Sequence, residues 1–318
     1  MNKLCILGAG VGGLSLAEQM MKEGDWEITL IDEREYTFSR KEIFPLLVGE
    51  KREVTYLKDL AKQKGIEFIN AKVEKINFNK RKISFKQAKS INFSNLVICC
   101  GLKSKDLSIK GSWRKGFLSF SHLDPLLVRK FLKISYDIIV YVSTFLGVKL
   151  AFYLSLLKKN IKVVADNLSF LGRYKEKVEE FLQKQGIDVY LGTRIEEVIG
   201  NSTVKATKVS LPKVFSSQLV FMDSGFIPCH DFLGENLAKE GFLTNYEGVY
   251  LLGDVINKDV GNQHFFFFNE EEVVAQSKVL ARFINNQQPI SYTKRVYEEE
   301  EINGRIERFL EEWKVKLK

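Results

Sequence analysis

Residues 3–13 read Lys-Leu-Cys-Ile-Leu-Gly-Ala-Gly-Val-Gly-Gly, an apolar run that enters a glycine-rich turn. Apolar residues at helical spacing follow over residues 14–21, and a second apolar run over residues 27–31 ends at Asp32. This order predicts a strand, a tight turn, a helix and a second strand. A dinucleotide requires that arrangement, because the N–H groups at the start of the helix bind its pyrophosphate.

Each glycine of the turn has a predicted role in such a site. Gly8 permits the tight turn, Gly10 lets the backbone approach the pyrophosphate, and Gly13 lets the helix pack closely on the strand. Asp32 follows about twenty residues later, where a carboxylate binds a ribose hydroxyl. The predicted site also includes Val11, Gly12 and Glu33. A glycine turn that merely packs is the alternative, but strand, helix, second strand and acid all fall in register and favour a nucleotide site.

The composition is that of a folded protein with more than one core. The chain has 318 residues, of which 45% are apolar and 28% charged, and this length predicts two domains. Its net charge of +8 is compatible with an anionic cofactor, an acidic partner or a membrane surface, and no motif favours nucleic acid. The four cysteines form no framework of paired spacings, which favours a reduced, cytoplasmic protein, and we expect no metal site.

The opening pattern begins again over residues 137–166, which predict a strand, a helix and a second strand. When the two motifs are aligned on Gly147, the first two glycine positions hold Val142 and Thr144. β-Branched residues there crowd both the turn and a closely bound pyrophosphate. Asp166 ends the second strand as Asp32 does in the first motif. Gly147 and Asp166 are therefore the candidate residues for NAD.

Two further strands predict ligand-binding groups at their ends. Residues 95–101 end in Cys100-Gly101, and residues 248–254 end in Gly253-Asp254. Open α/β sheets bind ligands at the carboxyl ends of their strands. Cys99 and Cys100 are adjacent, and in a strand their side chains face opposite sides of the sheet. We therefore favour structural cysteines over a redox pair.

Three segments raise the question of a membrane. Residues 138–157 approach the length of a membrane span, but their polar residues favour a buried strand, a turn and a helix. Phenylalanines 265–268 are interpreted as wedged between a cofactor and the domain junction, with an exposed membrane or quinone patch as the alternative. The apolar residues of the tail, 292–318, predict a helix that packs on the body or on a partner. Contact with the inner face of a membrane is the less favoured alternative.

Together these motifs resemble the two-dinucleotide-domain flavoprotein superfamily. Its members include pyridine nucleotide-disulfide oxidoreductases, type II NADH dehydrogenases, sulfide:quinone reductases and rubredoxin or nitrite reductase-type flavoproteins. The resemblance runs from residue 1 to about residue 285. It implies an α/β fold with two Rossmann-like three-layer domains that carry β-meander insertions. The implied boundaries are an FAD-binding domain of residues 1–112 and 226–290, an NAD(P)-type domain of residues 113–225 that interrupts it, and a C-terminal amphipathic helix of residues 291–318.

The resemblance also implies residue roles. FAD would lie across the first module, with the glycine turn at its pyrophosphate, Asp32 on the adenosine ribose and Val73 beside the adenine. Asp254 would hold the ribityl or phosphate side of the flavin. The further implied cofactor contacts are Arg40, Lys41, Cys100, Gly101, Gly253 and Phe267. Lys41 is also the candidate for tuning the flavin ring.

Departures from the family leave the reaction open. No cysteine pair follows Asp32, and Lys149 stands where the second module is expected to carry an acid. The leading hypothesis is an FAD-dependent oxidoreductase that NADH reduces and that a quinone or small redox protein reoxidises. The alternative is an FAD flavoprotein that no longer binds nicotinamide and receives electrons from a protein or sulfur donor. A third is a flavin-binding interaction protein without catalysis.

Overall fold

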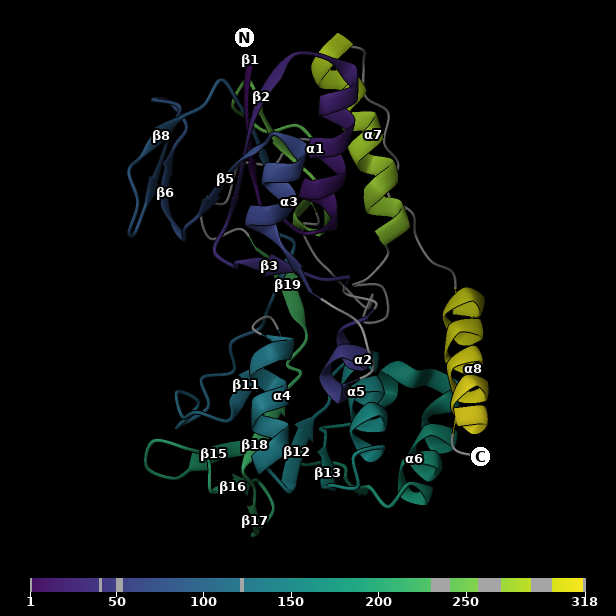
Figure 1. Cartoon of the computed structure of the whole chain (residues 1–318). Coiled ribbons are helices and arrows are strands. Elements are labelled where there is room, and N and C mark those ends of the chain that lie inside the picture. The colour runs from purple at the N-terminus through teal and green to yellow at the C-terminus, as the bar shows by residue number, and fades with distance from the viewer. Residues whose placement is uncertain are drawn as a thin grey trace.

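The computed structural model describes residues 2–39, 42–49, 54–120, 123–229, 241–256, 270–286 and 299–316. The chain forms two Rossmann-like units, one above the other in Figure 1. Each unit has a parallel five-stranded sheet between a layer of helices and a three-stranded antiparallel meander.

The sheet of the first unit has the order β20-β9-β1-β2-β5, and every neighbouring pair is parallel. Its strands are β1 (Asn2–Leu7), β2 (Trp26–Asp32), β5 (Glu67–Asn70), β9 (Asn95–Ile98) and β20 (Val249–Leu251). One face is covered by α1 (Val11–Glu23), α3 (Leu57–Lys64) and α7 (Glu270–Asn286), and the other by β6 (Val73–Asn77), β7 (Lys82–Phe85) and β8 (Ile91–Asn92). Along β1, Leu4 and Ile6 pack with the helices while Cys5 and Leu7 pack with the meander, as strand alternation requires.

The second unit repeats this plan with the parallel order β11-β18-β12-β13-β14. Its strands are β11 (Phe117–Ser119), β12 (Asp137–Tyr141), β13 (Asn160–Val164), β14 (Asp188–Tyr190) and β18 (Leu219–Met222). The helical layer contains α4 (Pro125–Ile134), α5 (Phe145–Ser155), the short helix η3 (Ser169–Tyr174) and α6 (Lys175–Lys184). The meander consists of β15 (Ile195–Ile199), β16 (Ala206–Val209) and β17 (Val214–Ser216).

Two short strands connect the units. The chain leaves the first unit through β10 (Leu102–Ser104) and returns through β19 (Phe226–Pro228), and the two strands pair antiparallel. The second unit therefore interrupts the first, which confirms the predicted fold class. The predicted domain boundaries at residues 112 and 225 fall between β10 and β11 and between β18 and β19; they stay a prediction.

A segment of the first unit also reaches the core of the second. After the hairpin strand β3 (Tyr36–Thr37), which pairs with β4 (Thr55–Tyr56), the helix α2 (Ile43–Val48) packs its apolar side chains with those of α5 and β12. Residues 55–56 form β4, and α3 begins directly after it at Leu57. The short helix η4 (Gly253–Ile256) follows β20.

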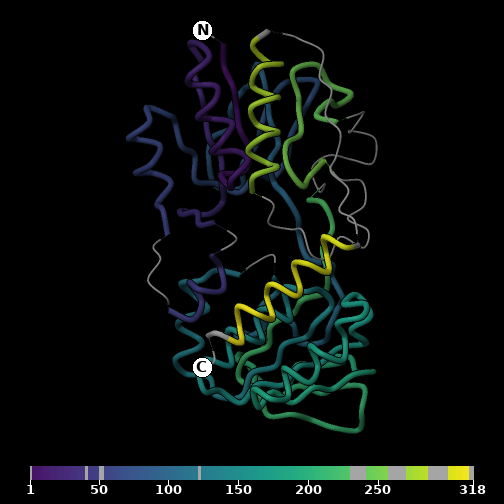
Figure 2. The backbone as a smooth tube through the Cα atoms, turned by 90° about the vertical axis from the view of Figure 1, so that its right-hand side faces the viewer, coloured from purple at the N-terminus to yellow at the C-terminus, as the bar shows by residue number. Residues whose placement is uncertain are grey.

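The C-terminal helix α8 (Glu299–Lys316) crosses the helical layer of the second unit (Figure 2). Its residues Phe309 and Trp313 are buried against the aromatic side chains of α5. The ring centroid of Phe309 lies 5.2 Å from that of Phe145, and the centroid of Trp313 lies 4.9 Å from that of Tyr153. The predicted amphipathic tail therefore packs on the body of the protein.

The apolar segment of residues 138–157 forms the buried strand β12, a turn and α5, as predicted. Helix α5 begins at Phe145, because Thr144 caps it: the Thr144 side chain accepts a hydrogen bond from the backbone N–H of Leu146. Among the described helices, none combines the length and the apolar character that a membrane span needs.

Candidate functional site

A cavity of 390 Å³ opens at the carboxyl ends of the strands of the first unit. Open α/β sheets bind ligands at this edge. Most of the residues that the sequence assigns to a cofactor line it, namely Gly8, Gly10, Val11, Gly12, Asp32, Glu33, Val73, Cys100, Gly101, Gly253 and Asp254. Gly13 is not among them, and Arg40, Lys41 and Phe267 lie outside the described residues. The flavin-tuning role of Lys41 stays a prediction.

The glycines of the turn differ in what surrounds them. Gly8 has a φ of +106°, and a Cβ there would lie 2.7 Å from the Cys99 carbonyl oxygen. A Cβ at Gly13 would lie 1.9 Å from the Gly8 carbonyl oxygen, so Gly13 permits close packing of the helix on the turn. At Gly10 a Cβ would meet nothing within 4 Å, since this residue faces the cavity. Gly8 and Gly13 thus serve the backbone, whereas Gly10 leaves space for a ligand.

The N-terminus of α1 is open to this cavity. Gly10 is its N-cap, and within the described part of the chain no side chain caps the first turn. The first N–H groups of a helix have no partner inside the helix and carry a partial positive charge. Val11 and Gly12, which form that first turn, line the cavity. The N-terminus of α1 is therefore suited to an anionic group such as a pyrophosphate.

Asp32 holds the turn in place from the end of β2. Its Oδ2 accepts a hydrogen bond from the backbone N–H of Ala9 at 2.7 Å, and its Oδ1 accepts one from that of Arg34 at 2.8 Å. Each carboxylate oxygen can accept a second bond. Asp32 can therefore accept hydrogen bonds from two ribose hydroxyl groups while it keeps its bonds to the turn. The open turn at Gly10 and this acceptor pair suit the pyrophosphate and one ribose of a dinucleotide.

Three cysteines border the cavity near Gly101. Cys99 packs with the helix-side core and Cys100 with the meander-side core, as the alternation predicts. The sequence pattern did not reveal that the Cys100 thiol forms a hydrogen bond with the Cys229 thiol. This bond and burial raise the pKa of Cys100 well above its usual range. Burial likewise raises the pKa of Cys99.

In the second unit, the corresponding helix N-terminus already holds an anion. Asp223, fully buried at the end of β18, accepts hydrogen bonds at Oδ2 from three donors. These are the backbone N–H of Ser143 at 3.2 Å, the backbone N–H of Thr144 at 2.8 Å and the Thr144 hydroxyl at 2.9 Å. Burial raises the pKa of Asp223 to about 6, against the opposing effect of these bonds.

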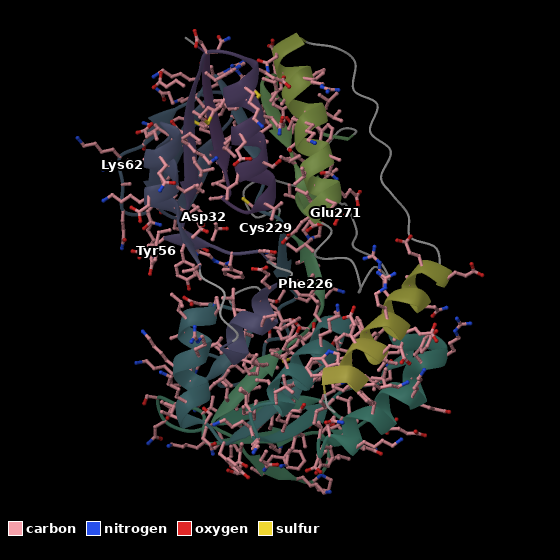
Figure 3. All side chains as sticks on the ribbon, turned by 45° about the vertical axis from the view of Figure 1, so that its right-hand side comes forward. Asp32, Tyr56, Lys62, Phe226, Cys229 and Glu271 are labelled. Carbon is pink, nitrogen blue, oxygen red and sulfur yellow. The ribbon has the colours of Figure 1, made fainter. Side chains whose placement is uncertain are left out.

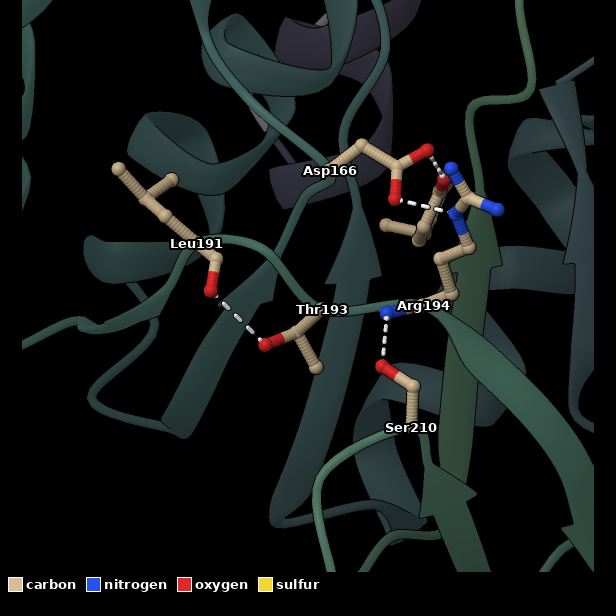
Figure 4. A network of polar contacts seen from close by, with 6 residues as sticks. Asp166, Leu191, Thr193, Arg194 and Ser210 are labelled. Atoms are coloured by element: carbon tan, nitrogen blue, oxygen red, sulfur yellow. Dashed lines mark hydrogen bonds and ion pairs between the residues drawn. The ribbon is translucent and has the colours of Figure 1, made fainter.

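Asp166, the candidate ribose acid of the second unit, is engaged by neighbouring side chains (Figure 4). Its Oδ1 lies 2.5 Å from Nε of Arg194, and its Oδ2 accepts a bond from the Tyr141 hydroxyl at 3.3 Å. The backbone N–H of Arg194 is held in turn by the Ser210 hydroxyl at 3.0 Å. The structure therefore brings Asp166 to the expected strand end but pairs it with a cation.

Lys149 also has a local explanation. Its ammonium lies 5.1 Å from the ring centroid of Phe145 and 5.4 Å from that of Phe309 on α8. Burial lowers the pKa of Lys149. The residue that replaces the expected acid thus faces the C-terminal helix, where an aromatic pair attracts its charge.

Comparison with known proteins agrees with this architecture. Residues 2–278 match the family described as pyridine nucleotide-disulphide oxidoreductase. The chain belongs to this family. Human apoptosis-inducing factor 3 is 24% identical over 311 residues, which cover 88% of this chain and 51% of that protein. The type II NADH:quinone oxidoreductase of Staphylococcus haemolyticus is 25% identical over 233 residues, 69% of this chain and 52% of that protein.

This family member spans about half the length of the curated relatives it matches. A solved NAD-dependent persulfide reductase from A. fulgidus superposes with a TM-score of 0.77 at 18% identity. The match covers 89% of this chain and 59% of that structure, and it shows the fold.

Three features of the site escaped the sequence patterns. Asp223 directly follows an apolar parallel strand, which is the signal that pointed to Asp254. Cys229 carries no local signal, because its partner lies on another element. Ser39 donates a hydrogen bond to Glu270 at 2.8 Å and joins the loop after β3 to the start of α7, beside the cavity.

Proposed function

We propose that this family member is an FAD-dependent oxidoreductase whose flavin is reduced by a donor other than a nicotinamide dinucleotide bound to the second unit. One contrast carries the proposal. The first-turn N–H groups of α1 face a cavity. At the start of α5, the Thr144 side chain caps the N–H of Leu146, and the N–H groups of Ser143 and Thr144 are bonded to the buried carboxylate of Asp223. The chain thus has one helix N-terminus that is open to a ligand and one that is occupied by the carboxylate of Asp223.

The first unit supplies the groups that an FAD needs. The turn at Gly10 and the start of α1 suit its pyrophosphate, and Asp32 suits the adenosine ribose. Gly253, Asp254 and the segment of Cys100 and Gly101 border the rest of the cavity. When bound, the flavin supplies the two-electron chemistry, and the protein fixes its position and the charge around it.

The second unit opposes a second dinucleotide on three grounds. A pyrophosphate at α5 would displace a buried carboxylate or lie beside its negative charge, which is unfavourable at low dielectric. The Val142 side chain crowds the same turn, with its Cγ2 3.1 Å from the position of a Cβ at Gly147. The carboxylate of Asp166 is already paired with Arg194.

Reduction by NADH, with a quinone or small redox protein as acceptor, is the competing proposal. The type II NADH:quinone oxidoreductase among the relatives supports it. It requires that Asp223 leave the N-terminus of α5 or that the nucleotide bind without the help of those N–H groups.

Anaerobic reduction of the FAD-reconstituted protein distinguishes the two. Dithionite is the positive control and is expected to bleach the flavin absorbance. NADH and NADPH, each in large excess, are expected to leave the spectrum unchanged over the same period. Rapid bleaching by either nucleotide would establish the competing proposal. A protein that retains no flavin after reconstitution would refute both.

A further inference from the structure

The loop of residues 105–116, between β10 and β11, presents an exposed tryptophan. Trp113 is 71% exposed, whereas Trp313 is 2% exposed and Trp26 is partly buried. The loop begins directly after β10, which pairs with β19 where the chain crosses between the units; Figure 3 labels Phe226 of β19 at this crossing. A large aromatic side chain that stays in water is a candidate for contact with another molecule.

The surroundings of Trp113 hold its ring in one place. Cζ of Arg114 lies 4.6 Å from the centroid of the indole ring, within the range of a cation–π contact. The Arg114 guanidinium donates hydrogen bonds to the carbonyl oxygens of Val198 at 2.9 Å and Gly200 at 2.5 Å, at the end of β15. Gly111 leaves room for it, since a Cβ there would lie 2.0 Å from Nη1 of Arg114. The indole therefore lies against a cation that the backbone fixes.

The backbone of the loop is fastened to the same meander. The N–H of Val198 donates to the carbonyl oxygen of Lys110 at 2.8 Å, and the N–H of Lys115 donates to that of Ser202 at 3.0 Å. The loop thus runs along β15 and the turn that follows it. Because the loop is already ordered, Trp113 can bind another molecule at a small cost in conformational entropy.

A second apolar side chain and two cations adjoin the indole. Ile199 is 37% exposed and lies between the two residues whose carbonyl groups bind Arg114. The backbone N–H of Lys205 donates to the Ile199 carbonyl oxygen at 2.9 Å. The side chains of Lys115 and Lys205 are exposed, and neither forms an ion pair within the described part of the chain. Apolar groups with cations beside them suit the boundary between water and an anionic apolar phase.

The same side of the molecule carries a strongly basic meander. Residues 72–89, which include β6 and β7, contain seven cations and one acid, Glu74, and all eight are exposed. Among them, Lys72 pairs with Glu33 at 3.6 Å. Figure 1 shows β6 and β8 of the first unit and β15 of the second on the left, whereas α7 and α8 lie on the right. Both units thus turn basic surface to one side.

We propose that this side of the protein binds a bilayer of anionic phospholipid, with Trp113 inserted among the headgroups and Lys115 and Lys205 against their phosphates. Tryptophan is enriched at the boundary between headgroups and acyl chains, because its ring is apolar and its N–H is polar. Each lysine near an anionic leaflet adds a favourable, salt-sensitive interaction.

The C-terminal helix is a poor anchor by comparison, because its residues Phe309 and Trp313 are buried against α5. The loop and the basic meander lie outside that contact. The inference does not depend on the flavin or on its electron donor, so the flavin-free protein can be used to test it.

Vesicle co-sedimentation of the full-length protein tests this surface. Phosphatidylcholine vesicles that contain about 30% phosphatidylglycerol are expected to bind the protein at least about tenfold more tightly than pure phosphatidylcholine vesicles. Trp113→Ala is expected to lower the affinity for the anionic vesicles at least about tenfold. Tyr136→Ala, which removes a 62% exposed aromatic side chain just after α4, is expected to leave it unchanged. Absence of binding by the wild type, or equal affinities of the two variants, would overturn the proposal.

Two double variants test the cations. Lys115→Gln combined with Lys205→Gln is expected to weaken binding to the anionic vesicles at least about fivefold. Lys130→Gln combined with Lys133→Gln removes the same charge from exposed positions on α4 and is expected to leave the affinity within about twofold of the wild type. Equal losses in the two double variants would show that net charge, and not this surface, causes the binding, and would refute the proposal.

Tryptophan fluorescence reports whether the indole enters the bilayer. On the anionic vesicles, the emission of the wild type is expected to shift to shorter wavelength and to be quenched by lipids brominated on their acyl chains. Trp113→Phe, which keeps Trp26 and Trp313, is expected to show neither effect. Wild-type emission that does not respond to vesicles would refute insertion. A dimer in sedimentation velocity that Trp113→Ala dissociates would assign the surface to a second copy of the chain and overturn the proposal.

Discussion

Gly147 and Asp223 make a contact that only a glycine allows: a Cβ at position 147 would lie 2.6 Å from Oδ2 of Asp223. In the first unit, a glycine-rich turn leaves room for a ligand at Gly10. In the second, the absence of a side chain at Gly147 leaves room for the chain's own carboxylate. The same type of helix N-terminus thus faces an open cavity in one unit and the chain's own carboxylate in the other.

Removing the Asp223 carboxylate is expected to make the N-terminus of α5 available to an external anion. In Asp223→Ala, the N–H groups of Ser143 and Thr144 lose their acceptor, at a cost of about 1–3 kcal/mol of stability. With FAD bound in the cavity of the first unit, we expect the variant to bind inorganic pyrophosphate with a Kd of about 1 mM, and the FAD-loaded wild type to bind none in calorimetry. Asp188→Ala, an exposed change in the same sheet, is the control. Equal heats from Asp223→Ala and the wild type would contradict the assignment.

The stability of the protein is expected to depend on pH through Asp223. Its pKa is about 6 in the folded protein and 3.8 in the unfolded chain, with burial as the main cause. Between these values the folded protein keeps a proton that the unfolded chain releases, so the contribution of Asp223 is complete below pH 3.8 and falls as the pH rises. The total decrease is about 3 kcal/mol at about 1.36 kcal/mol per pH unit.

Denaturant unfolding of Asp223→Asn isolates this effect, because an amide does not titrate. The free energy of unfolding of the wild type, relative to that of Asp223→Asn, is expected to decrease from about pH 3 to about pH 7 by about this amount. A difference that is flat, or that grows with pH, would show that Asp223 does not titrate in this range.

Substitutions at two glycines of the first motif are expected to affect different properties: FAD affinity at Gly10 and stability at Gly13. Gly10 has φ −77° and ψ −168°, a conformation open to any residue, and nothing stands within 4 Å of its missing Cβ. Gly10→Val should therefore leave the thermal unfolding of the flavin-free protein unchanged and lower FAD affinity at least about tenfold. Gly13→Ala places its Cβ against the Gly8 carbonyl oxygen and should cost about 3 kcal/mol or more.

Fluorescence titration with FAD measures the affinity of each variant, and thermal unfolding measures its stability. Unchanged FAD binding by Gly10→Val would place the pyrophosphate elsewhere. A fully stable Gly13→Ala would mean that helix α1 can move away from the turn.

The features that the sequence predicted are those with local causes. The turn at Gly8 and the acid at Asp32 belong to one continuous strand–helix–strand unit, and their spacing carries the geometry. Asp223 accepts its hydrogen bonds from residues 79 and 80 positions away in the chain. The contact between Cys100 and Cys229 likewise depends on the pairing of β10 with β19. Such distant pairings follow from the assembled sheets and not from any short motif.

The tail shows which features of a helix the spacing of apolar residues can predict. The apolar spacing over residues 292–318 predicts a helix with one buried face, and α8 has this face. The sequence could not predict which surface covers that face, because the buried residues of α5 are not confined to one side of the helix: Leu150, Ala151 and Phe152 are successive buried residues. The packing of the aromatic side chains of α5 and α8 determines where the tail helix lies.

Truncating the largest side chain of this contact tests whether α8 stabilises the second unit. Trp313 is 2% exposed, and its ring centroid lies 5.6 Å from that of Phe152. Trp313→Ala is expected to lower the free energy of unfolding by about 3–5 kcal/mol, through lost burial and the cavity left behind. Lys314→Ala, at the next and solvent-exposed position, should leave it unchanged. Denaturant unfolding measures both. If the two variants unfold alike, α8 lies on the second unit without stabilising it, and the burial of Trp313 contributes nothing to the fold.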